Sequence, residues 1–134
     1  MRVVLDTNVI VSAAIKAGSP PYEVVLWLIA NGGLLISSMT EEEVLLVLER
    51  PRLAQIVRPD FIPLVRTLMA GAEPVTLAER ISICRDAEDD KFLELAVNGH
   101  ADVAVSGDAD LLSLHPFRGI PIEIPAAFLR RVRT

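Results

Sequence analysis

The sequence contains a single cysteine, two lysines and few aromatic residues, and these scarcities exclude several classes of protein. The one thiol, Cys84, cannot form an internal disulfide or belong to a cluster of thiolate metal ligands. No apolar run reaches the roughly 18 to 20 residues that a membrane-spanning helix needs, although the mean hydropathy of +0.43 is high. The first residues lack the features of a secretory signal, so we expect a cytoplasmic protein with no membrane contact.

Basic charge is also scarce. The formal net charge is −5, and of the 13 basic residues only Lys16 and Lys91 are lysines. A net acidic chain does not hold nucleic acid by bulk electrostatics, because such binding needs a basic surface. Neither GxGxxG nor a GxxxxGKS or GxxxxGKT stretch occurs, so a glycine-rich phosphate loop is excluded as well. Any contact with a phosphate must therefore depend on a local site.

What the chain does have is a regular alternation of apolar strands and amphipathic helices. No repeat or linker-like segment divides it, so residues 1–134 are expected to form one domain. The alternation predicts an α/β fold, a three-layer α/β/α sandwich with a mainly parallel central sheet. Residues 81–84 are either a short strand or an extended approach to a helix. The expected strands are 3–5, 34–37, 103–106 and, near an edge, 120–124; the expected helices are 20–31, 40–50, 60–70, 89–98 and 108–114.

Acidic residues follow the predicted strands. Asp6 comes directly after the first strand, and Asp108 stands two residues past the strand 103–106. In an open parallel sheet, ligands collect outside the carboxyl ends of the strands. If these two strands are neighbours, both carboxylates converge on the same edge of the sheet.

Further acids are expected at this edge because they lie near the beginnings of helices that follow strands. Glu43 is near the start of the helix after strand 34–37, and Asp89 and Asp90 open the helix after residues 81–84. Carboxylates from four distant parts of the sequence would then share one cleft.

Clustered carboxylates repel one another unless a cation compensates them, and sites made of oxygen ligands prefer hard ions such as Mg2+ or Mn2+. One or two such ions can generate a hydroxide nucleophile and stabilise the leaving oxygen of a phosphodiester. Asn8 and Ser106 are placed to hold a water molecule or a phosphate oxygen at the same edge. The acid cluster therefore favours metal-dependent phosphodiester chemistry.

Each acid also has a purely structural interpretation. Thr40 and Glu43 fit the capping-box pattern T-x-x-E, which would explain the glutamate without catalysis. Asp6 could cap the helix that follows it, Asp108 could be a turn aspartate after a glycine, and acids are common in the first turn of helices. Separately these interpretations are the more common ones, whereas the joint placement of all four acids favours a functional site.

Four stretches together resemble the PIN-domain family. They are VVLDTNVIVSA, SSMTEEEVLLVLERPRL, CRDAEDDKFLELAVNGHADVAVSGDADLL and the ending that begins IPIEI, so the resemblance covers nearly the whole chain. The chain is most similar to the group described as toxin components of bacterial and archaeal toxin-antitoxin systems, related to VapC-type toxins. The resemblance implies a metal-dependent ribonuclease with a central parallel sheet and four acidic residues.

The resemblance also assigns roles to residues. Asp6 and Glu43 match the first two acids of the family, and Asp108 matches the fourth. For the third acid we prefer Asp90 to Asp89, because Asp90 precedes Asp108 by the 18 residues that we expect between the family's last two acids. Ser106 matches a small hydroxyl residue of the family, Asn8 is a candidate second-shell group, and Asp110 is an auxiliary candidate.

The surface that would bind RNA is less well defined. Ala87 stands where related sequences often have proline, a change that we expect to be harmless. The acidic balance leaves a short set of candidate cations, namely Arg50, Arg52, Arg85, Lys91 and the C-terminal Arg130, Arg131 and Arg133. A surface with so few basic residues is compatible either with an enzyme that acts on a selective substrate or with an inactive member of the family.

The leading hypothesis is a metal-dependent endoribonuclease, the toxin of a toxin-antitoxin module, with Mg2+ or Mn2+ held by Asp6, Asp90 and Asp108 and assisted by Glu43. By resemblance, its partners are RNA, an antitoxin protein and a second copy of the chain. The alternative is a catalytically weak or inactive PIN-fold binding module that acts through an antitoxin or self-association. A phosphotransfer enzyme is disfavoured, because the dehalogenase-like phosphatases need an acid where this chain has Asn8.

Overall fold

The sheet is parallel between all of its named strands within residues 1–133, the part of the chain that the computed structural model describes. β1 (Val3–Leu5), β4 (Val103–Val105) and β5 (Ile122–Glu123) form a three-stranded sheet in the order β1-β4-β5. β4 is therefore central, and the proline-containing segment 120–124 supplies an edge strand, as predicted.

A second pair of strands continues the sheet beyond β1. β2 (Leu35–Ile36) pairs in parallel with β3 (Glu73–Pro74). A parallel bridge between Val3 and Leu34 joins this pair to β1. β1 thus has β4 on one side and the residue before β2 on the other, which makes it an interior strand.

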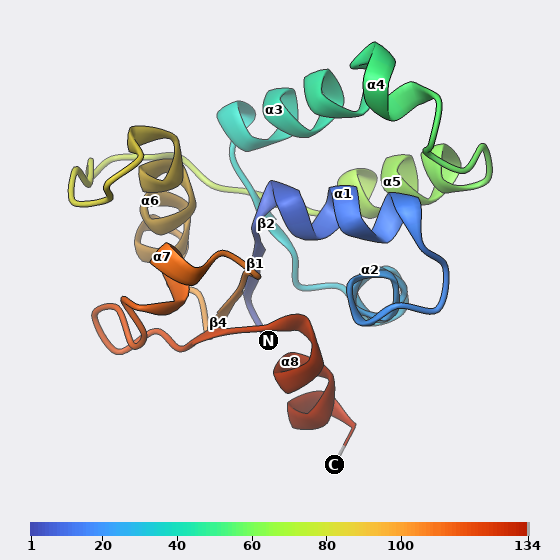
Figure 1. The fold of residues 1–134 in the computed structure, drawn as a ribbon. Helices are drawn as coiled ribbons and strands as arrows, with labels where there is room; N and C mark the ends of the chain where they lie inside the picture. The colour runs from blue at the N-terminus through green and yellow to red at the C-terminus, as the bar shows by residue number, and fades with distance from the viewer. Residues whose placement is uncertain (134) are drawn as a thin grey trace.

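The side chains of β1 alternate between two hydrophobic cores on opposite faces of the sheet. Val3 and Leu5 belong to the core on one face, and Val4 belongs to the core on the other. The first core is supplied by α1 (Thr7–Ile15), α2 (Pro20–Asn31), α3 (Ser38–Leu48), α5 (Phe61–Ala70) and α8 (Pro125–Val132). The second lies under α6 (Asp90–Asn98) and α7 (Ala109–Leu112). Figure 1 shows α6 and α7 on one side of the strands and α1, α2 and α5 on the other. The predicted three-layer α/β/α arrangement is confirmed.

The helix predicted to begin at Thr40 begins earlier. α3 (Ser38–Leu48) has Ser37 as its N-cap, and the capping box joins Ser37 to Thr40. The Ser37 backbone N–H donates to Thr40 Oγ1 at 2.9 Å, and the Thr40 N–H donates to Ser37 Oγ at 3.2 Å. The T-x-x-E interpretation is therefore wrong, since Glu43 lies in the second turn of α3 and takes no part in the cap.

Most other predicted helices match the structure closely. α2 begins with Pro20 and is capped by Ser19, and α5 ends at Gly71, as the sequence indicates. The expected helices did not include α1, which entered only as the helix that Asp6 could cap. The short α4 (Pro51–Ala54) and the C-terminal α8 were not predicted either, because four residues are too few for a periodic pattern and the arginines of α8 masked its apolar face. Among residues 1–133, no helix is both long and apolar enough to cross a membrane.

Gly33 lies in the turn that leads into β2 and hydrogen-bonds to the start of β1. Its φ is +103°, and its carbonyl accepts the backbone N–H of Val3 at 2.8 Å. A Cβ atom at this position would lie 2.1 Å from the carbonyl oxygen of Met1. Gly33→Ala is therefore expected to lower the free energy of unfolding by about 2 to 3 kcal/mol, from backbone strain together with displacement of the first residues.

Urea unfolding at neutral pH measures this loss, with Gly71→Ala as the matched control. Gly71 has a negative φ, and its added Cβ would meet no atom closer than 3.7 Å, so the control should change stability by less than about 0.5 kcal/mol. Equal losses in the two variants would contradict the assignment of strain to Gly33.

Candidate active site

The register of β1 against β4 brings Asp6 and Ser106 side by side. Leu5 pairs with Val105, and the backbone N–H of Asp6 donates to the Val105 carbonyl at 3.0 Å. The fully buried Ser106 hydroxyl donates to Asp6 Oδ2 at 2.8 Å and accepts the backbone N–H of Asp108 at 3.0 Å. One hydroxyl thus ties together the two acids that follow the two neighbouring strands.

Asp6 and Asp108 are helix caps as well as neighbours. Asp6 Oδ1 accepts the N–H of Asn8 at 3.3 Å at the start of α1, and Asp108 Oδ1 accepts the N–H groups of Asp110 and Leu111 at 2.7 and 3.3 Å at the start of α7. The capping and clustering interpretations are therefore compatible. In each acid one oxygen is held by the helix that follows it, and this bond fixes the orientation of the carboxyl group.

Glu43 faces Asp6 across a hollow of about 150 Å3, which we call the acidic pocket; its acidic lining residues are Asp6, Glu43, Asp86, Glu88 and Asp89. Burial raises the pKa of Glu43 and the charge of Asp6 raises it further, whereas Lys91 and a hydrogen bond with the Thr7 side chain lower it. Thr7 was not singled out from the sequence. Its signal was its position at the first residue of α1, where a side chain lies close to the capping acid.

Asp89 is surrounded by the negative charges of several other acids. Burial raises the pKa of Asp89 to about 6, and the charges of Asp108, Asp86, Asp6 and Asp110 contribute to the increase. Burial also raises the pKa of Asp6, with a further contribution from Asp108 that the hydrogen bonds from Ser106 and Asn8 oppose. These acids therefore form a group whose charges repel one another.

Asp90 does not join this group. Its side chain is buried, and its Oδ1 accepts the backbone N–H groups of Ile83 and Cys84 at 3.1 and 2.9 Å. These bonds lower the pKa of Asp90, the opposite of the shift at Asp89. The two adjacent acids therefore have different surroundings: Asp90 anchors the segment before α6, whereas Asp89 lines the acidic pocket together with Asp6.

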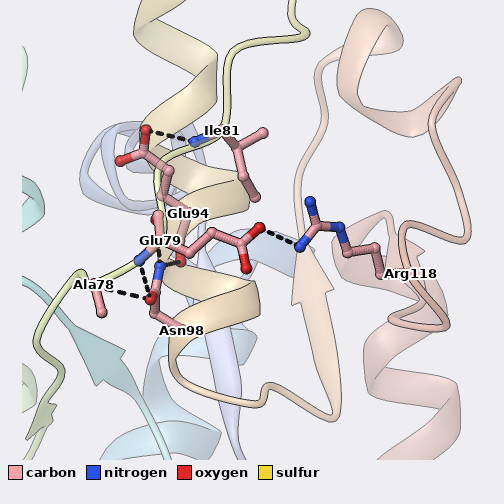
Figure 2. A network of polar contacts seen from close by, with 6 residues as sticks. All are labelled: Ala78, Glu79, Ile81, Glu94, Asn98 and Arg118. Carbon is pink, nitrogen blue, oxygen red and sulfur yellow. Dashed lines mark hydrogen bonds and ion pairs between the residues drawn. The ribbon is translucent and has the colours of Figure 1, made fainter.

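Asp90 is the first member of a polar row along α6 that holds residues 78–84. Glu94, four residues later, accepts the Ile81 N–H at 3.1 Å. Asn98, four residues further, accepts the N–H groups of Ala78 and Glu79 at 3.0 and 2.9 Å. Figure 2 shows the lower part of this row, where Glu79 also pairs with Arg118. Residues 81–84 are therefore an extended approach to a helix, and their backbone is bonded to side chains of α6 instead of a strand.

The remaining candidates are dispersed. Asp110 and Arg85 line a neighbouring hollow together with Asp89, and the ammonium group of Lys91 pairs with Glu88 at 2.7 Å beside the acidic pocket. Arg50 and Arg52 lie past the far end of α3. At the C-terminus, Arg131 pairs with Glu123 and Arg133 with Glu23 at 3.1 Å, and Arg130 is exposed. The structure therefore gathers Lys91 and Arg85 near the acids and leaves the other arginines away from the pockets that the acids line.

Cys84 has no role as a nucleophile here. Burial raises the pKa of its thiol to about 12, and the neighbouring Asp90 adds to the shift. The thiol is therefore protonated throughout the neutral range, and cysteine chemistry does not explain this pocket.

Within residues 1–133, no group of three or more His, Cys, Asp or Glu side chains is arranged so that it could hold a metal ion as it stands. The donor set nevertheless suits one kind of ion. All of the available ligands are oxygens, and carboxylates with raised pKa values gain most from a nearby cation. Mg2+ usually keeps several water molecules and binds through one or two carboxylates, so it does not require a closed cage. The residues fit a hydrated hard cation.

The PIN-domain family profile matches residues 2–110. The chain belongs to the PIN-domain family. This match spans Asp6, Glu43, Asp89 and Asp108, so all of the acids around the pocket lie within the PIN domain.

Solved structures agree on the fold. The PIN domain is similar to the crystal structure of VapBC2 from Rickettsia felis bound to a promoter DNA fragment, at 16% identity, with a TM-score of 0.61 over 92% of this chain and 98% of the other. It is also similar to PAE2754 from Pyrobaculum aerophilum, at 17% identity, with a TM-score of 0.62 over 100% of this chain and 91% of the other. A search of curated protein sequences found no match.

The opposite environments of Asp89 and Asp90 predict opposite effects of substitution. Asp90→Ala leaves two backbone N–H groups without their acceptor and should lower the free energy of unfolding by about 2 to 3 kcal/mol. Asp89→Asn removes a charge from a repelling cluster and should leave stability unchanged or raise it. Denaturant unfolding in EDTA at pH 7 compares the two variants, and a larger loss for Asp89→Asn would contradict the assignment.

The pH dependence gives a second check on Asp89. Its folded pKa of about 6 exceeds the unfolded value of about 3.9, so the folded state binds the proton more tightly. This group therefore favours folding at low pH, and its contribution is lost as the pH rises from about 4 to about 6. In EDTA, the difference in unfolding free energy between wild type and Asp89→Asn should change over that window. A difference that is constant from pH 4 to pH 7 would contradict the prediction.

Proposed function

We propose that this PIN domain is a metal-dependent endoribonuclease that hydrolyses RNA phosphodiester bonds. The observation that supports it most is the convergence of Asp6, Glu43, Asp89 and Asp108 at the carboxyl ends of β1 and β4, with raised pKa values at the first three. Clustered acids whose pKa values are shifted by burial and by one another's charges are typical of functional sites. The proposal places Asp89 where the sequence had suggested Asp90.

The ion, Mg2+ or Mn2+, would be held by Asp6, Asp89 and Asp108, with Glu43 assisting across the pocket. When bound, such an ion supplies Lewis-acid polarisation of the phosphate and lowers the pKa of water. Ser106 would keep Asp6 and Asp108 at their separation through its two hydrogen bonds. Burial raises the pKa of Glu43 above its usual value, which makes its carboxylate a stronger base for a proton of the attacking water.

The cellular role that we propose is the toxin of a toxin-antitoxin module in the cytoplasm, with an antitoxin and a second copy of the chain as partners. The fold shared with the PIN protein of the VapBC2 complex from Rickettsia felis supports this role. So does apolar surface on and after α3, where the side chains of Met39, Leu45, Leu46 and Ile56 are exposed. Large apolar side chains left exposed in this way are candidates for burial against a protein partner.

A second candidate function is a binding module whose acidic pocket has lost catalysis. Two observations favour it: the acids form no ready three-ligand group within residues 1–133, and Lys91 stands beside Glu43 and lowers its pKa. In this reading the ammonium group would partly replace the cation. Metal binding measured by calorimetry separates the two candidates, because the binding module would take up neither Mg2+ nor Mn2+.

Cleavage of a labelled RNA in Mn2+ tests the nuclease directly. Asp6→Asn and Asp89→Asn should each reduce the rate roughly hundredfold, and EDTA should abolish it. Asp90→Asn is the matched control beside Asp89→Asn. Its amide oxygen can still accept the two backbone N–H groups, so its rate should stay within about threefold of wild type.

The pattern among these variants decides the assignment. Cleavage that survives both EDTA and Asp6→Asn would exclude the metal-dependent mechanism. A loss confined to Asp90→Asn would restore that residue as the third acid and contradict the arrangement proposed above.

A further inference from the structure

A second and larger hollow lies next to the acidic pocket. Its volume is about 440 Å3, and it is an open hollow lined by α1, the turn after β4, the first residues of α2 and the beginning of α8 with the residue before it. Asn8 lines both hollows, and Asp108 lines the larger one. We call it the side pocket; the residues used below are Asn8, Ser12, Pro20, Asp108, Ile124 and Ala126.

The walls of the side pocket are mainly apolar. Pro20, Ile124 and Ala126 contribute carbon surface from three separate parts of the chain. Asp108 is the charged residue of the lining, and no lining residue within the described part of the chain is basic. A phosphate group would therefore be repelled from this hollow, whereas an uncharged ring would be accommodated.

Two polar side chains stand on one wall. Asn8 and Ser12 are four residues apart on α1, so they lie on the same face of the helix. Both are exposed, and neither side chain makes a hydrogen bond to another group within residues 1–133. An amide and a hydroxyl can each donate and accept, which matches the mixed donors and acceptors on the edge of a nucleobase.

We infer that the side pocket holds one nucleobase of the RNA strand, beside the phosphate that is cut at the acidic pocket. The inference rests on the proposed nuclease function and adds a determinant of base preference to it. Because Asn8 separates the two hollows, a strand with a phosphate at Asp6 and Asp108 has a neighbouring base within reach of the side pocket. The ring would lie against the proline and aliphatic walls, with its polar edge towards Asn8 and Ser12.

Binding is tested without cleavage, by NMR titration of the 15N-labelled protein in EDTA with each of the four ribonucleosides, which carry no phosphate for the acids to repel. Saturable shifts are expected at the amides of Ser12, Gly107 and Ala126, with ribose, which lacks a base, causing none of them. Ala126→Trp fills the pocket and should weaken binding at least tenfold. Ala70→Trp places the same side chain on an exposed position at the end of α5 and should bind as wild type does.

Ser12→Ala keeps the test decisive if Ala126→Trp does not fold. It removes a hydroxyl from the wall, and it should change which nucleoside binds most tightly. Absence of saturable shifts in wild type, equal shifts with ribose, or unchanged binding in both pocket variants would each overturn the inference.

Cleavage of an RNA with mixed sequence separates this inference from the proposed function. Wild type should favour one base next to the cleaved bond, and Ser12→Ala should reduce that preference at least threefold. Cleavage with a preference that neither pocket variant alters overturns the base site and leaves the nuclease intact. Nucleoside binding in the side pocket without cleavage by wild type overturns the nuclease and supports the base site.

Discussion

The hydrogen bonds of the Ser106 hydroxyl are the interaction on which the site depends. Because β1 and β4 are parallel neighbours, the residues after them emerge at the same edge, and Ser106 joins Asp6 to the backbone of Asp108 there. Two like charges would otherwise separate as far as their side chains allow. The buried hydroxyl holds them in place, and the backbone N–H groups of Asn8 and Asp110 each donate to one carboxylate oxygen, of Asp6 and Asp108 respectively.

The rest of the fold therefore holds these acids together although their carboxylates repel one another. Burial and mutual charge raise the pKa values of Asp6, Glu43 and Asp89. The stabilisation comes from the hydrophobic cores on the two faces of the sheet, which hold β1, β4 and their helices together. A site of this kind is most stable when its negative charges are compensated. Protonation at low pH and binding of a cation should therefore both reduce the repulsion between the carboxylates.

The beginning of α6 positions two adjacent acids towards different neighbours. Successive residues of an α-helix point about 100° apart, so Asp89 and Asp90 at its beginning cannot face the same neighbours. Asp89 faces the other acids, while Asp90 begins the row with Glu94 and Asn98 that binds the backbone of residues 78–84. That row fixes where the chain arrives before α6, and consequently where Asp89 is placed.

The sequence by itself determined the elements and the edge at which the acids meet. Apolar runs followed by Asp6 and by Ser106 to Asp108 are enough to predict strands that end in acids, because hydrophobic period and strand ends are local properties. Tertiary structure decided the details: Ser37 instead of Thr40 as the cap of α3, and the different environments of the adjacent Asp89 and Asp90. In both cases neighbouring residues of similar chemistry competed. The choice depended on which backbone N–H groups and charges the fold brought near each side chain, and residues distant in sequence set that environment.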